Sequence, residues 1–194
     1  EKNLVAFIDM AYQGFADSIK EDAAALDLFS ASGLQFFVSS SFSKSFSLYG
    51  ERVGALTIVT DSKDESARVL SQVKRVIRTN YSNPPTHGGA VVAAVLSSPE
   101  LRQMWEDELG GMRDRIRAMR TSLVANLKAE GAPDFDFINV QRGMFSYTGL
   151  TAAQVEKMRA DSGIYAVGTG RICVAALNTK NIGYVAKAIA AVIK

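Results

Sequence analysis

Short apolar runs in the first part of the chain alternate with a stretch of helical composition. Residues 4–8 are continuously apolar, which is typical of a strand covered on both faces in a parallel sheet. Residues 21–29 have helical composition, and residues 35–38 and 53–60 predict two further strands. The order strand, helix, strand favours an α/β domain with a mostly parallel sheet.

Longer periodic stretches in the middle of the chain predict helices. Apolar residues at helical spacing predict one helix over 61–80 and a shorter one over 90–96. Ser98 and Pro99 have the chemistry of an N-cap and a first helical position. From there an apolar stripe recurs every three or four residues as far as Leu127. We therefore expect a long helix that connects two parts of the chain.

The last third of the chain changes to short elements, as is typical of a small α+β domain. The predicted elements are strands over 135–140, 144–147, 164–167 and 171–174, a helix over 152–161, and a closing helix capped by Asn178 or Thr179. Together with the earlier patterns, this change divides the chain into three parts. They cover residues 1–98, 99–131 and 132–194.

Composition and charge exclude several classes of protein. The 194 residues carry 22 Lys and Arg against 20 Asp and Glu, and this net charge of +2 gives no broad attraction to nucleic acid or an anionic membrane. A single cysteine, Cys173, and a single histidine, His87, exclude an internal disulfide and the common zinc sites, and we expect no metal. No apolar run approaches the roughly 20 residues of a membrane-spanning helix. A reducing, cytoplasmic compartment fits this composition best.

Three conspicuous side chains are interpreted as structural. His87 follows a turn and is expected to be a loop or cap residue, because no carboxylate or nucleophile accompanies it in the sequence. Trp105 lies on the stripe of the long helix and is expected in the core. Cys173 lies in an apolar strand and is expected to be a small buried hydrophobe.

Candidate chemistry gathers in the serine-rich segment 39–47, where the second predicted strand ends. Lys44 stands among hydroxyls in this segment, and Arg52 follows eight positions later. A lysine amine is a potential nucleophile, and hydroxyls with a guanidinium suit a phosphate. Asp9 and Tyr12 follow the first predicted strand, so both strand ends would face one crevice. On this segment alone, a solvated polar loop is the commoner alternative.

Five short motifs occur in one order across nearly the whole chain. They are Asp-Met-Ala-Tyr-Gln-Gly-Phe at 9–15, Ser-Phe-Ser-Lys at 41–44 with Tyr-Gly-Glu-Arg-Val-Gly at 49–54, Asn-Tyr-Ser-Asn-Pro-Pro at 80–85, Gly-Met-Phe-Ser at 143–146, and Gly-Thr-Gly-Arg at 168–171. Together they resemble the pyridoxal-phosphate-dependent aminotransferases of the aspartate and aromatic amino acid type, which are class I enzymes of fold type I.

The resemblance covers only the C-terminal half of such enzymes. It implies an α/β fold that comprises the C-terminal part of a mostly parallel sheet domain binding pyridoxal phosphate (PLP), a long connecting helix and a small α+β domain. The N-terminal half of the same enzyme would then be a missing partner, and the chain is expected to be a fragment. Because three strands cannot form a well-covered parallel sheet by themselves, we expect a large exposed apolar face.

The resemblance implies a role in cofactor binding for each polar residue at the predicted strand ends. Lys44 matches the lysine that forms a Schiff base with PLP and then moves a proton between the substrate and the cofactor. Asp9 matches the carboxylate that keeps the pyridine nitrogen protonated, and Tyr12 matches the phenol that hydrogen-bonds the 3′-oxygen. The implied phosphate ligands are Ser41, Ser43 and Arg52.

Substrate binding is also implied by the resemblance. Arg171 matches the arginine that binds the substrate α-carboxylate, and Phe145 lies in a matched motif beside the substrate. Arg78 matches a residue that reaches across a homodimer to the distal carboxylate of aspartate or glutamate, although relatives specific for aromatic substrates can keep it. Without the resemblance, Arg171 would be read as a surface arginine.

The implied activity is transfer of an amino group from aspartate or an aromatic amino acid to 2-oxoglutarate. Two alternatives stay open. One is a non-catalytic C-terminal module that self-associates or binds a partner through its exposed face. The other is a different PLP enzyme of the same fold type, such as a β-lyase, which shares the Schiff-base lysine.

Overall fold

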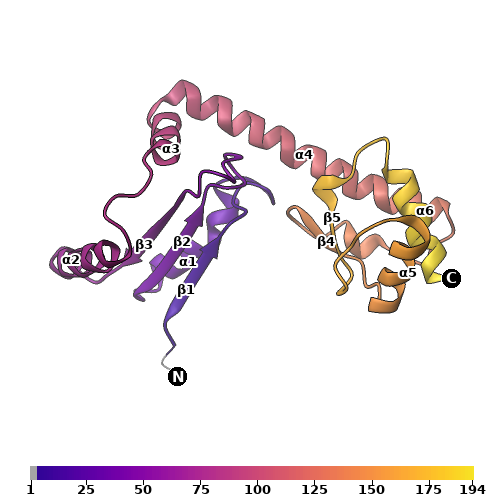
Figure 1. Cartoon of the computed structure of the whole chain (residues 1–194), viewed down its shortest axis with the longest axis horizontal. Helices are drawn as coiled ribbons and strands as arrows, with labels where there is room; N and C mark the ends of the chain where they lie inside the picture. The colour runs from indigo at the N-terminus through magenta and orange to yellow at the C-terminus, as the bar shows by residue number, and fades with distance from the viewer. Residues whose placement is uncertain (1–3) are drawn as a thin grey trace. The chain divides into compact units, whose positions relative to one another are not determined.

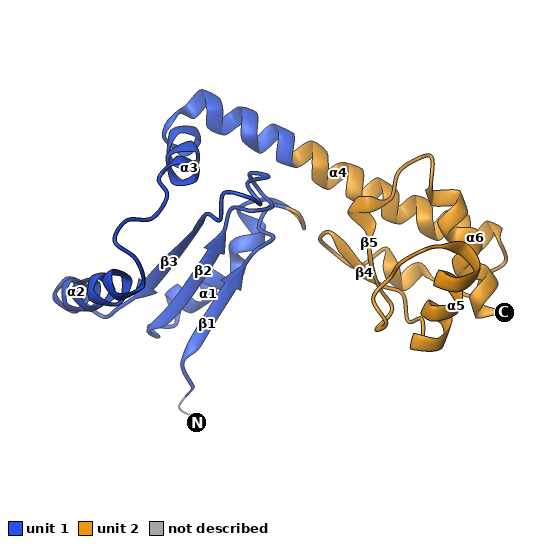
Figure 2. Cartoon of the chain, viewed as in Figure 1, with its two compact units in different colours: residues 1–14, 18–109 blue, residues 15–17, 110–194 orange. Residues whose placement is uncertain are grey.

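The computed structural model describes residues 4–194, and the chain divides into two compact units (Figure 2). The first unit comprises residues 1–14 and 18–109, and the second comprises residues 15–17 and 110–194. The main boundary between the units falls inside one long helix, α4 (Pro99–Ala129). The limits expected from the sequence, after residues 98 and 131, follow the two ends of this helix instead.

The first unit is built on a three-stranded sheet in the order β1-β2-β3 (Figure 1). The strands are β1 (Ala6–Met10), β2 (Phe36–Ser41) and β3 (Gly54–Val59). The helix α1 (Ala24–Ala31) lies between β1 and β2 in the chain, and these two strands are parallel. The predicted β-α-β order is therefore confirmed.

The third strand departs from the parallel arrangement that the sequence favoured, because β3 pairs with β2 in the antiparallel direction. Residues 42–53 connect the two strands through turns and form no helix. A parallel pairing needs a crossover that returns the chain to the opposite end of the sheet, and such a crossover is usually a helix. The turns instead leave both strands meeting at the segment that carries Lys44.

Three helices follow the sheet, close to their predicted bounds. Ser62 caps α2 (Lys63–Asn80) by accepting a hydrogen bond from the Glu65 backbone N–H at 3.2 Å. Next come α3 (His87–Ser97) and α4, which begins at Pro99 as predicted. His87 is the first residue of α3, at its N-terminal end.

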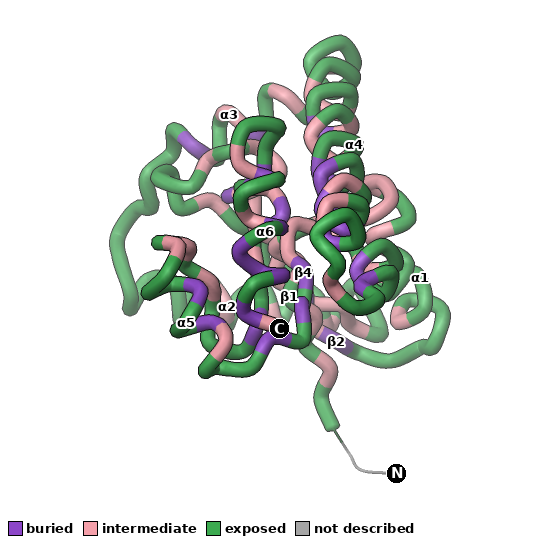
Figure 3. The backbone as a smooth tube through the Cα atoms, turned by 90° about the vertical axis from the view of Figure 1, so that its right-hand side faces the viewer, coloured by how far each residue is buried: buried purple, intermediate pink, exposed green. Residues whose placement is uncertain are grey.

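The second unit packs helices against a two-stranded antiparallel sheet. Its elements are the second part of α4, β4 (Phe145–Tyr147), α5 (Ala152–Ser162), β5 (Arg171–Cys173) and α6 (Ile182–Ile193). The apolar stripe of α4 is buried here, and Figure 3 shows buried stretches along α5 and α6. The largest fully buried side chains of this unit are Leu123, Leu127, Ile138, Met158, Val174 and Ile189.

Two predicted strands of the second unit are wrong. Within 135–140 the chain forms a short 3-10 helix, Asp136–Ile138, because the Asp134 carboxylate accepts a hydrogen bond from the Asp136 backbone N–H at 2.8 Å and starts a turn. Residues 164–167 form no strand and instead lead into a turn, in which the Gly170 N–H donates to the Val167 carbonyl at 2.8 Å.

Two further expectations for the second unit need correction. Cys173 is exposed, because it shares one face of β5 with the exposed Arg171 while Ile172 points to the other face. The closing helix starts at Ile182, later than predicted. The Asn178 carboxamide first accepts hydrogen bonds from the backbone N–H groups of Lys180 and Asn181, which makes a turn before the helix.

Large apolar side chains are exposed around the sheet of the first unit, as the sequence predicts. Phe7 on β1 is 65% exposed, Leu4 and Val5 just before it are also exposed, and Leu56 on β3 is exposed. No residue of β3 is buried. Within residues 4–194, no helix combines the length and apolar character needed to cross a membrane.

Candidate functional site

The carboxyl ends of β1 and β2 bring a carboxylate and a hydroxyl together. Asp9 and Ser39 are partners in the parallel register of the two strands. The Ser39 hydroxyl donates a hydrogen bond to Asp9 Oδ1 at 3.0 Å. One oxygen of the exposed carboxylate is thereby fixed in orientation. The sequence analysis gave Ser39 no role, although the parallel pairing of the two predicted strands could have indicated it.

Lys44 lies on a compact turn directly after β2. The Phe46 N–H donates to the Phe42 carbonyl at 3.2 Å, and the Ser47 N–H donates to the Lys44 carbonyl at 3.1 Å. The half-buried Lys44 side chain extends towards the loop after β1, where its Nζ lies 4.6 Å from the centroid of the Tyr12 ring. The structure therefore joins residues from the ends of two neighbouring strands.

The turn closes on Ser47, which has a positive φ of 55°. This left-handed conformation is uncommon for a residue other than glycine and costs free energy. Contacts around the turn must therefore hold it in place, and an aromatic cluster supplies them.

Trp105 of α4 contacts the turn that carries Lys44. Its Nε1–H donates to the Ser45 carbonyl at 2.6 Å, and its ring stacks on Phe46 with centroids 4.5 Å apart and an interplanar angle of 21°. Phe46 in turn meets the edge of Phe42 at 5.5 Å. The sequence placed Trp105 in the core, and the structure places it half-buried against the turn that carries Lys44.

The candidate phosphate ligands lie at the same end of the sheet. Ser41 is the last residue of β2, and its hydroxyl accepts a hydrogen bond from the Ser43 N–H at 3.3 Å. Gly54 pairs with Ser41 across the strands, and Arg52 precedes Gly54 by two positions. The exposed Arg52 side chain donates to the Tyr49 carbonyl at 3.0 Å, and its φ of 56° is again left-handed.

A close approach between α3 and the Arg52 segment requires glycine. At Gly88, in the first turn of α3, an added Cβ would lie 2.2 Å from Val53 Cγ2 and 2.8 Å from Glu51 Cβ. No real Cβ is tolerated at such distances, so the absent side chain lets the helix seat against residues 51–53. The helix thereby fixes the backbone on both sides of Arg52.

The second unit joins two of the residues assigned to substrate. Arg171 begins β5, and its guanidinium carbon lies 4.9 Å from the centroid of the Phe145 ring on β4. Arg171 is exposed and makes no ion pair with any residue in the described part of the chain. A guanidinium oriented by a ring and free of carboxylates is suited to bind an anion.

Arg78 stands apart from the other candidates. It lies in the last turn of α2, is exposed, and donates from Nη1 to the Ser82 hydroxyl at 2.5 Å. No hydrogen bond or ion pair between Arg78 and another candidate residue exists within residues 4–194. The described chain therefore does not join Arg78 to the other candidate site residues.

At the sheet end of the first unit, the donor set fits a phosphorylated aldehyde with a cationic ring. Lys44 offers an amine to the aldehyde, Asp9 a carboxylate to the ring cation and Tyr12 a phenol to a ring oxygen. Hydroxyls and a guanidinium for the phosphate lie at the same end of the sheet. In the described part of the chain, no group of three or more His, Cys, Asp or Glu residues is arranged to hold a metal.

The chain is similar in sequence to a known protein family. The model of the family aminotransferase class I and II matches residues 1–189. An aspartate aminotransferase of Pseudomonas aeruginosa is 69% identical over 193 residues, which are 99% of this chain and 48% of that protein. An aromatic-amino-acid aminotransferase of Escherichia coli is 50% identical over 98% of this chain and 48% of its own length.

A solved structure is similar over the full chain. It is an aromatic-amino-acid aminotransferase from Burkholderia pseudomallei covalently bound to pyridoxal phosphate, with 73% identity and a TM-score of 0.96 over 100% of this chain and 49% of that one. The chain therefore spans about half the length of the relatives it matches.

Proposed function

This chain belongs to the aminotransferase class I and II family, and from that premise we propose that the whole protein is a PLP-dependent aminotransferase. It transfers an amino group from aspartate or an aromatic amino acid to 2-oxoglutarate. The observation that carries the proposal is the position of Lys44 Nζ, 4.6 Å from the Tyr12 ring at the end of the sheet that also carries Asp9. Relatives named for both substrate classes support it.

Residues of the first unit would hold the cofactor. When bound, PLP supplies an electron-withdrawing ring that stabilises negative charge on the substrate α-carbon. Asp9, held by Ser39, keeps a proton on the ring nitrogen, and Tyr12 donates to the ring oxygen. Arg52 provides the phosphate with a guanidinium. The hydroxyl ligands of the phosphate are Ser41 and Ser43.

Lys44 has two tasks in this proposal. Its amine would hold the cofactor through the aldehyde and would be released when a substrate amine takes its place. The freed amine moves a proton from the substrate α-carbon, which is general acid–base work typically worth about 10²- to 10⁴-fold in rate. Trp105 holds the turn that carries Lys44, and this fixes the main chain from which the Lys44 side chain reaches the cofactor aldehyde and the substrate α-carbon.

Two arginines bind the substrate in this proposal. Arg171, oriented by Phe145, binds the α-carboxylate. Arg78 binds the distal carboxylate of a dicarboxylic substrate across a homodimer, which explains why it has no role within one chain. A cytoplasmic location accompanies the proposal and is supported by the single, free cysteine.

The test uses the intact protein that contains this sequence. Adding PLP is expected to give a visible absorbance band that changes with pH, and Lys44→Ala is expected to abolish it. Lys63→Ala, at the exposed start of α2, is the matched control and should keep the band. A wild-type protein without the band would overturn the proposal.

Product analysis separates the possible reactions. The intact protein is supplied with 2-oxoglutarate and either aspartate or tyrosine, and separately with cystathionine. Glutamate formed from aspartate or tyrosine supports the aminotransferase. Pyruvate and ammonia released from cystathionine, with no glutamate in the first two reactions, would instead indicate a β-lyase.

A further inference from the structure

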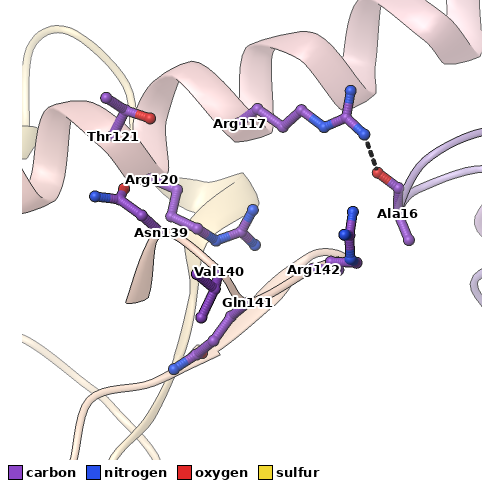
Figure 4. Close-up of a pocket in the computed structure, with 8 residues that line it drawn as sticks. All are labelled: Ala16, Arg117, Arg120, Thr121, Asn139, Val140, Gln141 and Arg142. Atoms are coloured by element: carbon purple, nitrogen blue, oxygen red, sulfur yellow. Dashed lines mark hydrogen bonds between the residues drawn. The ribbon is translucent and has the colours of Figure 1, made fainter. Parts of the chain in front are cut away.

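The second unit contains a cavity of about 400 Å³ that the proposed function does not use (Figure 4). Side chains from α4 and from the loop before β4 form its walls. Its lining residues are Ala16, Arg117, Arg120, Thr121, Asn139, Val140, Gln141 and Arg142. Three of these eight residues are arginines, so positive charge is concentrated here in a chain whose net charge is only +2.

Two of the three guanidiniums share a carboxylate. Arg117 Nη2 lies 2.8 Å from Asp17 Oδ1, and Arg142 Nη1 bonds to the same oxygen. Arg117 also stands 3.7 Å from the carboxylate of Asp114. Asp17 therefore illustrates the ligand that these side chains select, since one carboxylate oxygen already bridges two guanidiniums.

Arg120 is the third arginine, and its bonding partners are neutral. The residue is only 3% exposed, and it donates to the Ser146 hydroxyl at 3.1 Å and to the Gly143 carbonyl. It makes no ion pair with any of residues 4–194. Burial lowers the pKa of the Arg120 guanidinium, and the positive charge of Arg117 lowers it further. Arginine nevertheless stays charged in proteins, so this is a buried cation that lacks a counter-ion.

The charge count around the cavity specifies the missing group. Arg117 and Arg142 pair with the carboxylates of Asp17 and Asp114, and the positive charge of Arg120 is left without a counter-charge. A single carboxylate matches that charge, whereas a doubly charged phosphate would exceed it. Planar carboxylates also fit the fork of an arginine.

We propose that this cavity is a carboxylate-binding site formed by Arg120 and Arg142, with the carboxamide of Asn139 at its wall. The carboxylate has two possible sources, which share this chemistry. One is an Asp or Glu side chain from outside these 194 residues, since the relatives are about twice as long. The other is a free carboxylic acid. The site lies within the second unit and does not depend on Lys44 or on the proposed activity.

Crystal structures of the intact protein test the site and distinguish the two sources. Crystals with chloride as the only small anion are expected to show an Asp or Glu side chain of the longer polypeptide within hydrogen-bond distance of Arg120 or Arg142. If no side chain is there, crystals soaked in sodium acetate are expected to show acetate at the same position. Only water, chloride or neutral groups in both crystals would overturn the proposal.

Solution measurements on variants complete the test. Arg142 is suited to substitution because its side chain is 62% exposed and its loss should leave the fold intact. For a free acid, Arg142→Gln should weaken acetate binding by at least about tenfold, the effect of one charged hydrogen bond, while Arg159→Gln, an exposed arginine on α5, should not. If Arg142→Gln and wild type bind acetate equally, the acetate seen in the crystal is an adventitious additive only. That result would overturn a free carboxylic acid as the ligand of the cavity.

For a side-chain source, the readout is thermal unfolding in a background that removes the known ion pair. In Asp17→Asn protein, Arg142 no longer has that carboxylate as a partner within this chain. Arg142→Gln should still lower the unfolding temperature there, and Arg159→Gln should leave it unchanged. No effect of Arg142→Gln in this background would overturn the side-chain arm.

Discussion

At the scale of single residues, the site depends on how one carboxylate is held. Asp9 is exposed on β1, and its carboxylate accepts a hydrogen bond from the Ser39 hydroxyl of the neighbouring strand. A carboxylate that keeps a ring nitrogen protonated works best when its orientation is fixed, because reorientation would cost free energy at the moment of reaction. Ser39 is therefore a positioning residue for the proposed chemistry.

Ser39→Ala tests this role. The variant loses one hydrogen bond to a charged group, so kcat/KM for amino transfer by the intact protein should fall by about fivefold, which corresponds to about 1 kcal/mol. Asp9→Asn should cost far more, and adding Ser39→Ala to it should cost little further. Ser40→Ala, the next residue of β2, is the control. Equal rates for Ser39→Ala and Ser40→Ala would contradict the positioning role.

Sequence reasoning reached some of these residues and missed others for a physical reason. The motifs around Asp9 and Lys44 were visible because each stands where a predicted strand ends. The contact of Trp105 with Ser45 spans 60 positions, and that of Arg120 with Ser146 spans 26. Such contacts depend on how helices pack, which a local pattern does not encode.

At the scale of elements, α4 supports the turn that bears Lys44. The turn contains Ser47 in a left-handed conformation, and Trp105 binds it with a hydrogen bond and a stacked ring. The helix is therefore part of the framework of the site as well as a connection between the two units. Loss of the Trp105 indole N–H would leave the Ser45 carbonyl without its hydrogen-bond donor on α4.

Trp105→Phe separates the hydrogen bond from the ring stack. The phenyl ring can still stack on Phe46, so the free energy of unfolding should fall by about 1–2 kcal/mol, the cost of one unsatisfied carbonyl. The absorbance band of the bound cofactor should also shift its pH dependence, because the turn bearing Lys44 is less fixed. Urea unfolding and a pH titration of the intact protein measure the two effects. Met104→Leu on the same helix is the control. If Trp105→Phe and Met104→Leu gave the same urea unfolding and the same pH titration, Trp105 would not support the Lys44 turn.

The packing of α3 against residues 51–53 can also be tested by substitution. Gly88→Ala would place a Cβ in conflict with Val53 and Glu51, so the helix must shift and the protein should lose about 1–3 kcal/mol of stability. Gly89→Ala is a matched control, since nothing lies within 4 Å of its added Cβ, and it should gain about 0.5–1 kcal/mol as a better helix former. Chemical denaturation measures both. The same sign of change for the two variants would contradict this account.

Helices and strands also differed in how well the sequence predicted them. Helices such as α2 and α4 carry long apolar stripes and clear N-terminal caps, and these signals are local. The short strands of the second unit have three residues each, so alternation over 135–140 could not be distinguished from an aspartate-initiated turn. The exposure of Cys173 depends on which face of a two-stranded sheet is covered, which is a property of the tertiary structure.

At the scale of the whole molecule, β1 forms one of the two open edges of the sheet in the described part of the first unit. In the described chain, β1 is an edge strand that pairs only with β2, and Phe7 on it is 65% exposed. Edge strands with large exposed apolar side chains are normally covered, because they otherwise pair with other chains. The relatives, which are about twice as long, have enough additional chain to supply such cover.

Hydrogen exchange in the intact protein tests whether β1 is covered. In a parallel pair with β2 alone, alternate backbone N–H groups of Ala6–Met10 point away from the partner strand and exchange with water. If the remaining polypeptide adds a strand beside β1, successive amides should be protected, and the protection should rise by orders of magnitude at the alternate positions. Mass spectrometry with residue-level fragmentation resolves this pattern, with the amides of α5, on the other unit, as an internal reference. Fast exchange at alternate positions of β1 in the intact protein would mean that the edge stays open, and the exposed apolar surface would then need a different partner.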